Sequence, residues 1–236
     1  MNEGDEMDLN IKARNIGEST RVYVYNILSD NIINLNLKPG CSISEKEIAD
    51  LLNVSRTPVR EAFIQLSQED LIETYPQKGT YVSLIDLDLV EESRFMRETL
   101  ESAVAKLAAK EFPQALLFDL ESNLNMQSFC IKEKNYTQMM KYDDEFHETL
   151  FKGTNKSRVW ESIQRIGAQF RRFRTLNLVS TSIDTWETTY QDHTLILKAI
   201  KGKNGDEAAE MMKTHLTRAV FDKIMLQEKC PDYFKR

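Results

Sequence analysis

The chain has 236 residues, of which 41% are hydrophobic and 29% charged, and its formal net charge is −6. This apolar content supports one large or two modest folded domains and excludes wholesale disorder. Glycine and proline are scarce, at eight and five residues, which disfavours an all-β fold and favours long helices. The negative charge argues against a protein that coats nucleic acid nonspecifically, because that affinity comes from neutralising phosphates. A site-specific binder with a locally basic surface is still allowed.

Nothing in the sequence predicts contact with a membrane. No run approaches the roughly 18 apolar residues of a transmembrane helix, and the acidic start MNEGDEMDLN lacks the pattern of a signal peptide. Cys41, Cys130 and Cys230 are far apart and match neither a disulfide framework nor a metal knuckle. We therefore expect a cytoplasmic protein, with a flexible acidic segment over residues 1–17.

Residues 18–85 are predicted to form three short helices followed by a two-stranded hairpin. Ser44 and Glu47 have the spacing of a capping box and start the second helix. Ser55 is expected to cap the third helix. The stretch 71–84 alternates between polar and apolar residues like paired strands. Three helices and a hairpin in this order are typical of a winged helix-turn-helix.

Polar residues suited to DNA begin the predicted third helix: Ser55, Arg56, Thr57 and Arg60. This is the end of the helix that enters the major groove in helix-turn-helix docking. Arginine can pair with guanine or hold phosphates, and hydroxyl groups can contact either. Lys78 and Gly79, at the hairpin tip, suit a phosphate or minor-groove contact. The alternative is that both arginines are ordinary solvated helix residues.

Residues 88–232 are predicted to form an all-helical bundle of about six helices, so the fold as a whole is mainly α. The predicted segments are 87–111, 114–133, 135–152, 155–180, 184–201 and 205–229, each with an apolar stripe. Three aromatic residues are interpreted as packing: Phe146, Phe170 and Phe173. Three basic residues of the fourth segment are interpreted as a solvated or interface face: Arg171, Arg172 and Arg174.

All three histidines of the chain lie in this helical region. Asp143 precedes His147 by one helical turn, so the two side chains share a face. His193 and His215 lie on the last two predicted helices, which a short turn makes antiparallel neighbours, so the two rings can face each other. Three imidazoles and a carboxylate suit Zn²⁺, Ni²⁺, Mn²⁺ or Fe²⁺. The alternative is three unrelated histidines on packed helices.

The run from Leu37 to Leu84 resembles the DNA-binding domain of the GntR family of bacterial transcription regulators. The matching pieces are L-x-P-G, E-x-x-I-A-x-x-L, V-S-R-T-P-V-R-E-A and P-x-x-G-x-x-V. The resemblance implies that three side chains face the groove, Arg56, Thr57 and Arg60, that Lys46 touches phosphate, and that Lys78-Gly79 forms the wing tip. Asp70 stands where the family usually has glycine. Because Asp tolerates the left-handed conformation, we expect a local cost there and not a different fold.

The helical region resembles the FCD ligand-binding domain of the FadR subfamily. Metal-binding members carry D-x-x-x-H and one histidine on each of two later helices, and this chain has D-D-E-F-H, D-H-T-L and K-T-H-L in that order. The resemblance implies a divalent metal ion, zinc before the others, held by Asp143, His147, His193 and His215. Arg97, in R-E-T-L-E, matches an arginine that faces the effector cavity and would hold a carboxylate. Its alternative role is a surface partner for Glu101. Arg171 and Arg174 are further candidates to add positive charge to this cavity, although a solvated or interface face is the favoured interpretation.

These features predict a transcriptional regulator, a repressor and not an enzyme, that responds to a small carboxylate metabolite. The resemblance implies a homodimer, whose two-fold symmetry would match a palindromic operator. Relief of repression by the ligand is the expected sign. A metal-dependent enzyme that uses the Asp/His/His/His site is the main alternative, although no motif supplies a nucleophile or a clearly placed general base. A helical adaptor that binds only protein is a third possibility.

Overall fold

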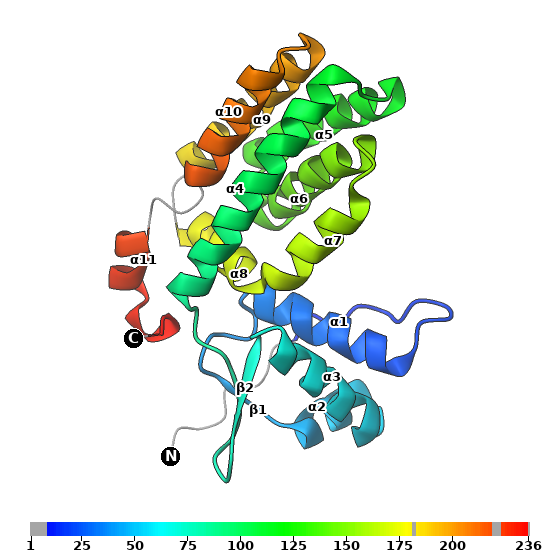
Figure 1. Ribbon diagram of the computed structural model, residues 1–236. Helices are drawn as coiled ribbons and strands as arrows, with labels where there is room; N and C mark the ends of the chain where they lie inside the picture. Colours follow the sequence, from blue (N-terminus) through cyan, green and yellow to red (C-terminus); the bar gives the residue numbers. More distant parts are fainter. Residues whose placement is uncertain (1–8, 181–182, 219–222, 236) are drawn as a thin grey trace. The chain divides into compact units, whose positions relative to one another are not determined.

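The computed structural model describes residues 9–180, 183–218 and 223–235 (Figure 1). The chain is mainly helical, which confirms the predicted fold class. Its internal contacts divide it into two compact units, one of residues 1–87 with 227–236 and one of residues 88–226. Within the described ranges, no helix has the length and hydrophobicity needed to cross a membrane.

The first unit is a winged helix with a small sheet. Its helices are α1 (Thr20–Ile33), α2 (Glu45–Leu52) and α3 (Arg56–Gln68), and its strands are β1 (Ser42–Ile43), β2 (Ile72–Tyr75) and β3 (Gly79–Val82). The strands pair antiparallel in the order β1-β3-β2, with Ile72 opposite Val82. The hairpin is confirmed, whereas β1 escapes sequence-based prediction because two residues are too short to show a period.

The two predicted N-caps of this unit differ. The hydroxyl of Ser44 accepts a hydrogen bond from the Glu47 N–H at 3.2 Å and donates one to the Glu47 carboxylate at 2.9 Å, so the cap of α2 is confirmed. Ser55 has the extended backbone of an N-cap residue, but its side chain makes no capping hydrogen bond. The third helix therefore starts where the sequence predicts, without the predicted cap.

The helices and the sheet of the first unit share one apolar core. Its fully buried members include Val24, Leu28, Ile48, Val59, Leu66, Leu71 and Val82. Asp70, between α3 and β2, has a φ of 55°, so the expected left-handed residue is confirmed. The hydroxyl of Ser83 donates a hydrogen bond to the backbone carbonyl of Asp70 at 2.6 Å. Of the segment predicted to be flexible, residues 9–17 are described, and the Asn10 N–H donates to Asn31 Oδ1 at 2.8 Å.

A segment from far along the chain completes this unit. The Ile85 N–H donates to the Tyr233 carbonyl at 2.8 Å, and the Lys235 N–H donates to the Ile85 carbonyl at 2.9 Å. These bonds form a parallel bridge between Ile85 and Phe234, whose ring is buried. The Lys235 ammonium also pairs with Asp86 at 2.9 Å. We call residues 231–235 the return segment.

The second unit is a helical bundle. Its helices are α4 (Leu87–Lys110), α5 (Gln114–Lys132), α6 (Tyr136–Gly153), α7 (Ser157–Ile166), α8 (Ala168–Ser180), α9 (Ile183–Lys201), α10 (Gly205–Arg218) and the start of α11 (Lys223–Lys229), whose residues from 227 on belong to the first unit. The chief packing pairs are α5 with α6, α9 with α10 and α5 with α9 (Figure 1). Phe146, Phe170 and Phe173 are buried, as predicted.

One predicted helix, 155–180, is divided within the described part of the chain. The predicted segment 155–180 ends and restarts at Gly167, which is the C-cap of α7. A Cβ added at Gly167 would lie 2.8 Å from the Ile163 carbonyl oxygen, so this tight junction needs glycine. The predicted segment 205–229 contains α10 and α11, and its residues 219–222 lie outside the described residues.

Candidate metal centre and adjoining cavity

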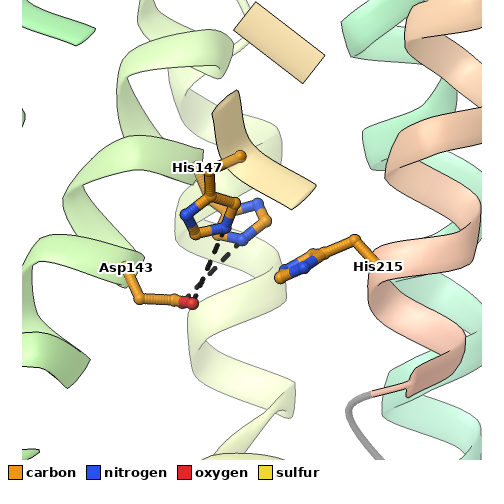
Figure 2. Close-up of side chains that lie close together, drawn as sticks. Asp143, His147 and His215 are labelled. Carbon is orange, nitrogen blue, oxygen red and sulfur yellow. Dashed lines mark ion pairs between the residues drawn. The ribbon is translucent and has the colours of Figure 1, made fainter. Parts of the chain in front are cut away.

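The four predicted metal ligands come together in the helical unit. Asp143 and His147 lie one turn apart on α6, His193 lies on α9 and His215 lies on α10. Each offers a ligand atom, and these atoms all lie within 4.8 Å of one another. Figure 2 shows the carboxylate of Asp143 and the rings of His147 and His215 turned toward a common space. All four side chains are buried.

The turn between α9 and α10 explains why two histidines so far apart in sequence meet. Lys203 takes a positive φ of 57°, and Asn204 Oδ1 accepts from the Glu207 N–H at 3.3 Å in the first turn of α10. Since this short turn makes the helices packed neighbours, residues at equal distances from it face each other. The ring centroids of His193 and His215 are 4.6 Å apart. The predicted pairing of these helices is confirmed.

Each of the three rings has a side-chain oxygen near its Nδ1. The Nδ1 of His193 makes a hydrogen bond, whereas the Nδ1 of His147 and its neighbouring Glu101 Oε2 lie close without hydrogen-bond geometry. The pairs are His193 with Gln127 Oε1 at 2.9 Å, His147 with Glu101 Oε2 at 2.5 Å, and His215 with Asp192 Oδ2 at 3.5 Å. An acceptor at Nδ1 keeps the proton on that nitrogen and leaves the lone pair on Nε2. Such outer partners commonly orient histidines that ligate a metal.

Two of the Nε2 atoms have no hydrogen-bond partner among the described residues. The Nε2 atoms of His147 and His193 are fully buried and unpaired. They lie 3.8 and 3.7 Å from the Asp143 carboxylate oxygens. Because leaving buried polar atoms unpaired is costly, and three nitrogens with one carboxylate suit a borderline-soft ion, these residues fit a divalent transition metal.

The pKa shifts of His193, His215 and Asp143 also suit a metal. Burial lowers the pKa of His193 well below its ordinary value, and the neighbouring His215 lowers it further. Burial lowers the pKa of His215 too. Burial alone would raise the pKa of Asp143, but the Arg174 guanidinium beside it, helped by the rings, holds it far below its usual range. Neutral imidazoles and an ionised carboxylate are the forms that bind metals.

A cavity of about 400 Å³ lies against this cluster and is lined by Asp143 and His215. That volume is within the range of small-molecule pockets. Its other polar lining residues include Arg97, Arg174, Arg218, Asn177, Thr188 and Thr189. The cavity therefore combines three guanidinium groups, the carboxylates of Asp143 and Asp192, and hydroxyl and amide groups.

Arg97 lines the cavity and also contacts Glu101. It pairs with Glu101, whose Oε1 lies 2.5 Å from Arg97 Nε, but both side chains are buried, so the alternative of a surface pair is wrong. The guanidinium lies over the rings of Phe170, at 5.1 Å, and Trp160, at 5.8 Å. Its Nη2 is buried with no hydrogen-bond partner among the described residues. Despite burial, which alone would raise it, Arg97 and His147 lower the pKa of Glu101 to about 2.

The predicted solvated face of α8 is wrong. Arg172 is 0% exposed and Arg174 is 8% exposed. Arg174 donates to the carboxylate of Asp143 and, at 3.2 Å, to that of Asp144. These paired carboxylates offset the cost of burying the guanidinium. Arg174 thus lines the cavity and contacts a predicted metal ligand.

Sequence reasoning missed the outer partners of the histidines. Asp192 is next to His193 in D-H-T-L, but neighbouring residues on a helix point about 100° apart, and Asp192 contacts His215 instead. Gln127 is a single amide inside a predicted helix and carries no signal in sequence. Glu101 is visible only as the neighbour of Arg97 at i+4. The contacts of all three depend on how separate helices pack.

The residues predicted to contact DNA lie in the first unit, and all of them are exposed. They are Lys46 on α2, Ser55, Arg56, Thr57 and Arg60 at the start of α3, and Lys78 and Gly79 at the β2–β3 turn. Neither Arg56 nor Arg60 has an ion-pair partner in the part of the chain that the structure describes. The structure thus leaves these cations open to solvent.

Two family models match the chain. The model described as bacterial regulatory proteins, gntR family, matches residues 20–82, and the FCD domain model matches residues 92–218. The HTH-type transcriptional repressor RspR of Escherichia coli K12 is 32% identical over 89% of this chain and 92% of its own length. The gluconate operon transcriptional repressor of Bacillus licheniformis is 27% identical over 80% of this chain and 78% of its own length.

Solved structures have the same fold. McbR/YncC of E. coli aligns with a TM-score of 0.76 and 19% identity over 90% of this chain and 99% of its own. A regulator described as GntR from Rhodococcus sp. RHA1 aligns with a TM-score of 0.73 and 23% identity over 89% of this chain and 99% of its own. At these identities, the likeness shows the fold alone.

Proposed function

The chain belongs to the GntR family of bacterial regulatory proteins and carries an FCD domain, and on this premise we propose that it is a repressor whose operator affinity is controlled by a small carboxylate bound beside a divalent metal ion. Its relatives are DNA-binding transcriptional regulators, and the alternative of a metal-dependent enzyme has no support from them. The FCD domain is consistent with the FadR subfamily.

One observation carries the ligand part of the proposal. The cavity is lined by two members of the metal cluster, Asp143 and His215, and by Arg97 and Arg174. A planar guanidinium pairs well with a carboxylate, and Arg97 keeps a buried Nη2 without a partner among the described residues. The metal would supply a further positive centre for the anion. Hydroxyl groups at Thr188 and Thr189 suit a hydroxylated acid.

The name of one relative agrees with this chemistry. The gluconate operon repressor is named for an operon of a polyhydroxylated carboxylate. This chain shares 27% identity with that protein, which supports the class of ligand and not gluconate itself. We therefore propose a small hydroxylated carboxylate as the effector.

Operator binding is assigned to residues 18–85, and ligand binding and dimerisation to residues 88–232. Arg56, Thr57 and Arg60 would read the major groove, and Lys46 and Lys78 would hold phosphates. A homodimer would match a palindromic operator in the cytoplasm. Ligand and metal would favour one arrangement of the dimer over another and so shift operator affinity.

The metal content of untagged protein, purified without chelator, tests the proposal first. We expect about one ion per chain, zinc before nickel, manganese or iron, and we expect the His147→Ala/His193→Ala variant to lose it. The single variants His193→Ala and His215→Ala should also bind far less metal. A wild type that neither contains nor takes up Zn²⁺, Ni²⁺ or Mn²⁺ would contradict the metal part of the proposal.

Operator release tests the rest. Genomic fragments retained by the protein should be released by a hydroxylated carboxylate in the presence of metal, and Arg97→Leu should blunt that release. Release by neutral sugars as readily as by acids would contradict the assigned role of the arginines. If the protein retains DNA and no carboxylate changes that retention, the proposed ligand class is wrong, while DNA binding still stands.

A further inference from the structure

We propose that Glu101 is a positioning residue shared by the metal cluster and the ligand arginine, so that one carboxylate couples the two parts of the site. The inference rests on the proposed function, because it takes the histidine cluster to hold a metal ion. It adds a residue that belongs to neither the predicted ligand set nor the predicted DNA contacts. Glu101 lies on α4, whereas the cluster is built from α6, α9 and α10.

The two oxygens of the Glu101 carboxylate face different partners. Its Oε1 lies 2.5 Å from Arg97 Nε, and its Oε2 lies 2.5 Å from His147 Nδ1. The side chain is 1% exposed, so water does not compete for either oxygen. Two other carboxylates of the described residues also lie between a cavity arginine and a predicted ligand histidine. Asp143, itself a predicted ligand, pairs with Arg174 and lies 3.7 Å from His193 Nε2. Asp192 lies 2.5 Å from Arg218 and 3.5 Å from His215 Nδ1. Arg218 is 47% exposed, so of the two carboxylates outside the predicted ligand set, Glu101 is the one whose partners are both buried.

Toward the metal, Glu101 fixes the ring of His147. An anionic acceptor at Nδ1 holds the proton there, sets the orientation of the ring and makes Nε2 a stronger donor to a cation. The Nε2 atom of His147 is buried and lacks a hydrogen-bond partner among the described residues. Without the carboxylate, the ring could turn or change tautomer, and Nε2 would bind the ion less well.

Toward the ligand, Glu101 fixes the guanidinium of Arg97. It holds Nε, while Trp160 and Phe170 lie within 5.8 and 5.1 Å of the guanidinium carbon. Nε is therefore engaged, and Nη2 is left over for an anion. Since both partners depend on one carboxylate, a change at Arg97 must alter the affinity of the cluster for metal, and coupling of this kind is reciprocal.

The test measures Co²⁺ and Zn²⁺ affinity of the full-length protein by chelator competition, and the visible spectrum of the Co²⁺ form. Glu101→Gln keeps the shape of the side chain but removes its charge. We expect a loss of metal affinity of about 10–100-fold and a changed Co²⁺ spectrum. The matched control is Glu98→Gln on the same helix, where the carboxylate pairs with Arg94, and it should match wild type in both measurements.

A second variant guards against misfolding. Glu101→Gln leaves the Arg97 guanidinium buried without its carboxylate, which can unfold a protein. The Arg97→Leu/Glu101→Gln variant removes both charges and completes a double-mutant cycle with Arg97→Leu. If Glu101 has this shared role, the loss of Co²⁺ affinity in the double variant should differ from the product of the two single losses by about threefold or more. Circular dichroism confirms that each variant is folded.

The outcomes separate the two proposals. A wild type that takes up no Co²⁺ or Zn²⁺ overturns the metal part of the proposed function, and this inference with it. A wild type that binds metal, beside a folded Glu101→Gln variant with unchanged affinity and spectrum, overturns this inference alone. Strictly additive effects in the cycle overturn the coupling to Arg97. A purely structural Glu101 would lower stability and leave the metal affinity and the spectrum of folded variants as they are.

Discussion

Arg60 illustrates what a single residue contributes to the proposed operator contact. It is exposed in the early turns of α3, and no ion pair engages it within the described ranges. If Arg60 reads a base, Arg60→Ala should weaken operator binding by about 1–3 kcal/mol and relax the preference at one position of the site. Fluorescence anisotropy with the operator and with single-base variants measures both effects.

Arg158→Ala is the control for charge, because Arg158 is exposed on α7 in the helical unit. It should leave operator affinity unchanged. A uniform loss across all sequences in Arg60→Ala, with a smaller salt dependence, would instead assign Arg60 to a phosphate. An unchanged affinity would show that Arg60 is an ordinary solvated residue.

At the scale of single residues, the sequence predicted which side chains lie together wherever they share a helix or a motif. Asp143 and His147 share a face by their spacing alone, and a short turn brings His193 to His215. The resemblance added Arg97, which does line the cavity. Gln127 and Arg174 were beyond reach, since their contacts to His193 and Asp143 cross between helices. Spacing within one helix carries no information about such contacts.

At the scale of the elements, two serines start neighbouring helices in different ways. Ser44 makes a capping hydrogen bond to the Glu47 N–H, and Ser55 makes none at α3. We expect Ser44→Ala to lower the free energy of unfolding by about 1 kcal/mol, and Ser55→Ala to change it by a few tenths at most. Urea denaturation of both variants measures the difference. Equal losses would contradict this difference in capping, and loss of operator affinity in Ser55→Ala alone would assign its hydroxyl to DNA.

Glu91 links two helices of the second unit. Its carboxylate pairs with Arg94 on α4 and with Lys223 on α11, both at 2.6 Å. Hydrogen bonds from Arg94 and then Lys223 lower the pKa of Glu91 to about 2, from 4.5. A lowered pKa means that the paired carboxylate stabilises the fold above about pH 4.5 and that this stabilisation is lost as the pH falls toward 2.

Glu91→Gln should therefore destabilise the protein at pH 7 and make no difference near pH 2. Because Glu91 is 44% exposed, the effect at pH 7 should stay below about 1 kcal/mol. Denaturation curves of wild type and variant across this pH range measure it. Glu92→Gln, one position along and exposed, serves as the control. A difference that grows as the pH falls would have the wrong sign.

Periodicity located the helices well and their interruptions poorly. The apolar stripe of 155–180 continues through Gly167, so the pattern gives one helix where the structure has two. The break depends on Gly167, which has no Cβ to collide with the Ile163 carbonyl oxygen. Such a local steric effect leaves no trace in the periodicity of apolar residues. Likewise β1 forms only because β3 lies beside it, and two residues have no pattern of their own.

At the scale of the whole molecule, the return segment (residues 231–235) is hydrogen-bonded to the winged helix at Ile85. Phe234 is 4% exposed, so Phe234→Ala should remove about 3 kcal/mol of stability from this unit. Hydrogen exchange at the Ile85 amide, which donates to the Tyr233 carbonyl, should become faster in the variant. Phe118→Ala on α5, where the ring is 67% exposed, is the matched control. Unchanged exchange at Ile85 would show that the unit holds without the ring.

The order of elements and the resemblance predicted a winged helix followed by a helical bundle, but not the return segment. Its residues match neither family model, since the matches end at residues 82 and 218. The pairing of Asp86 with Lys235 spans 149 positions. A five-residue segment with no period gives no sign of so distant a partner.

This pairing has a consequence for the order of synthesis. At about 5–20 residues per second, the ribosome needs roughly 7–30 s to add the 149 positions between these partners. During that interval, the site that Phe234 covers stays uncovered on the nascent winged helix. The DNA-binding unit is therefore completed only after the helical unit has been translated. A newly made regulator reaches its operator with the ligand-binding part already attached.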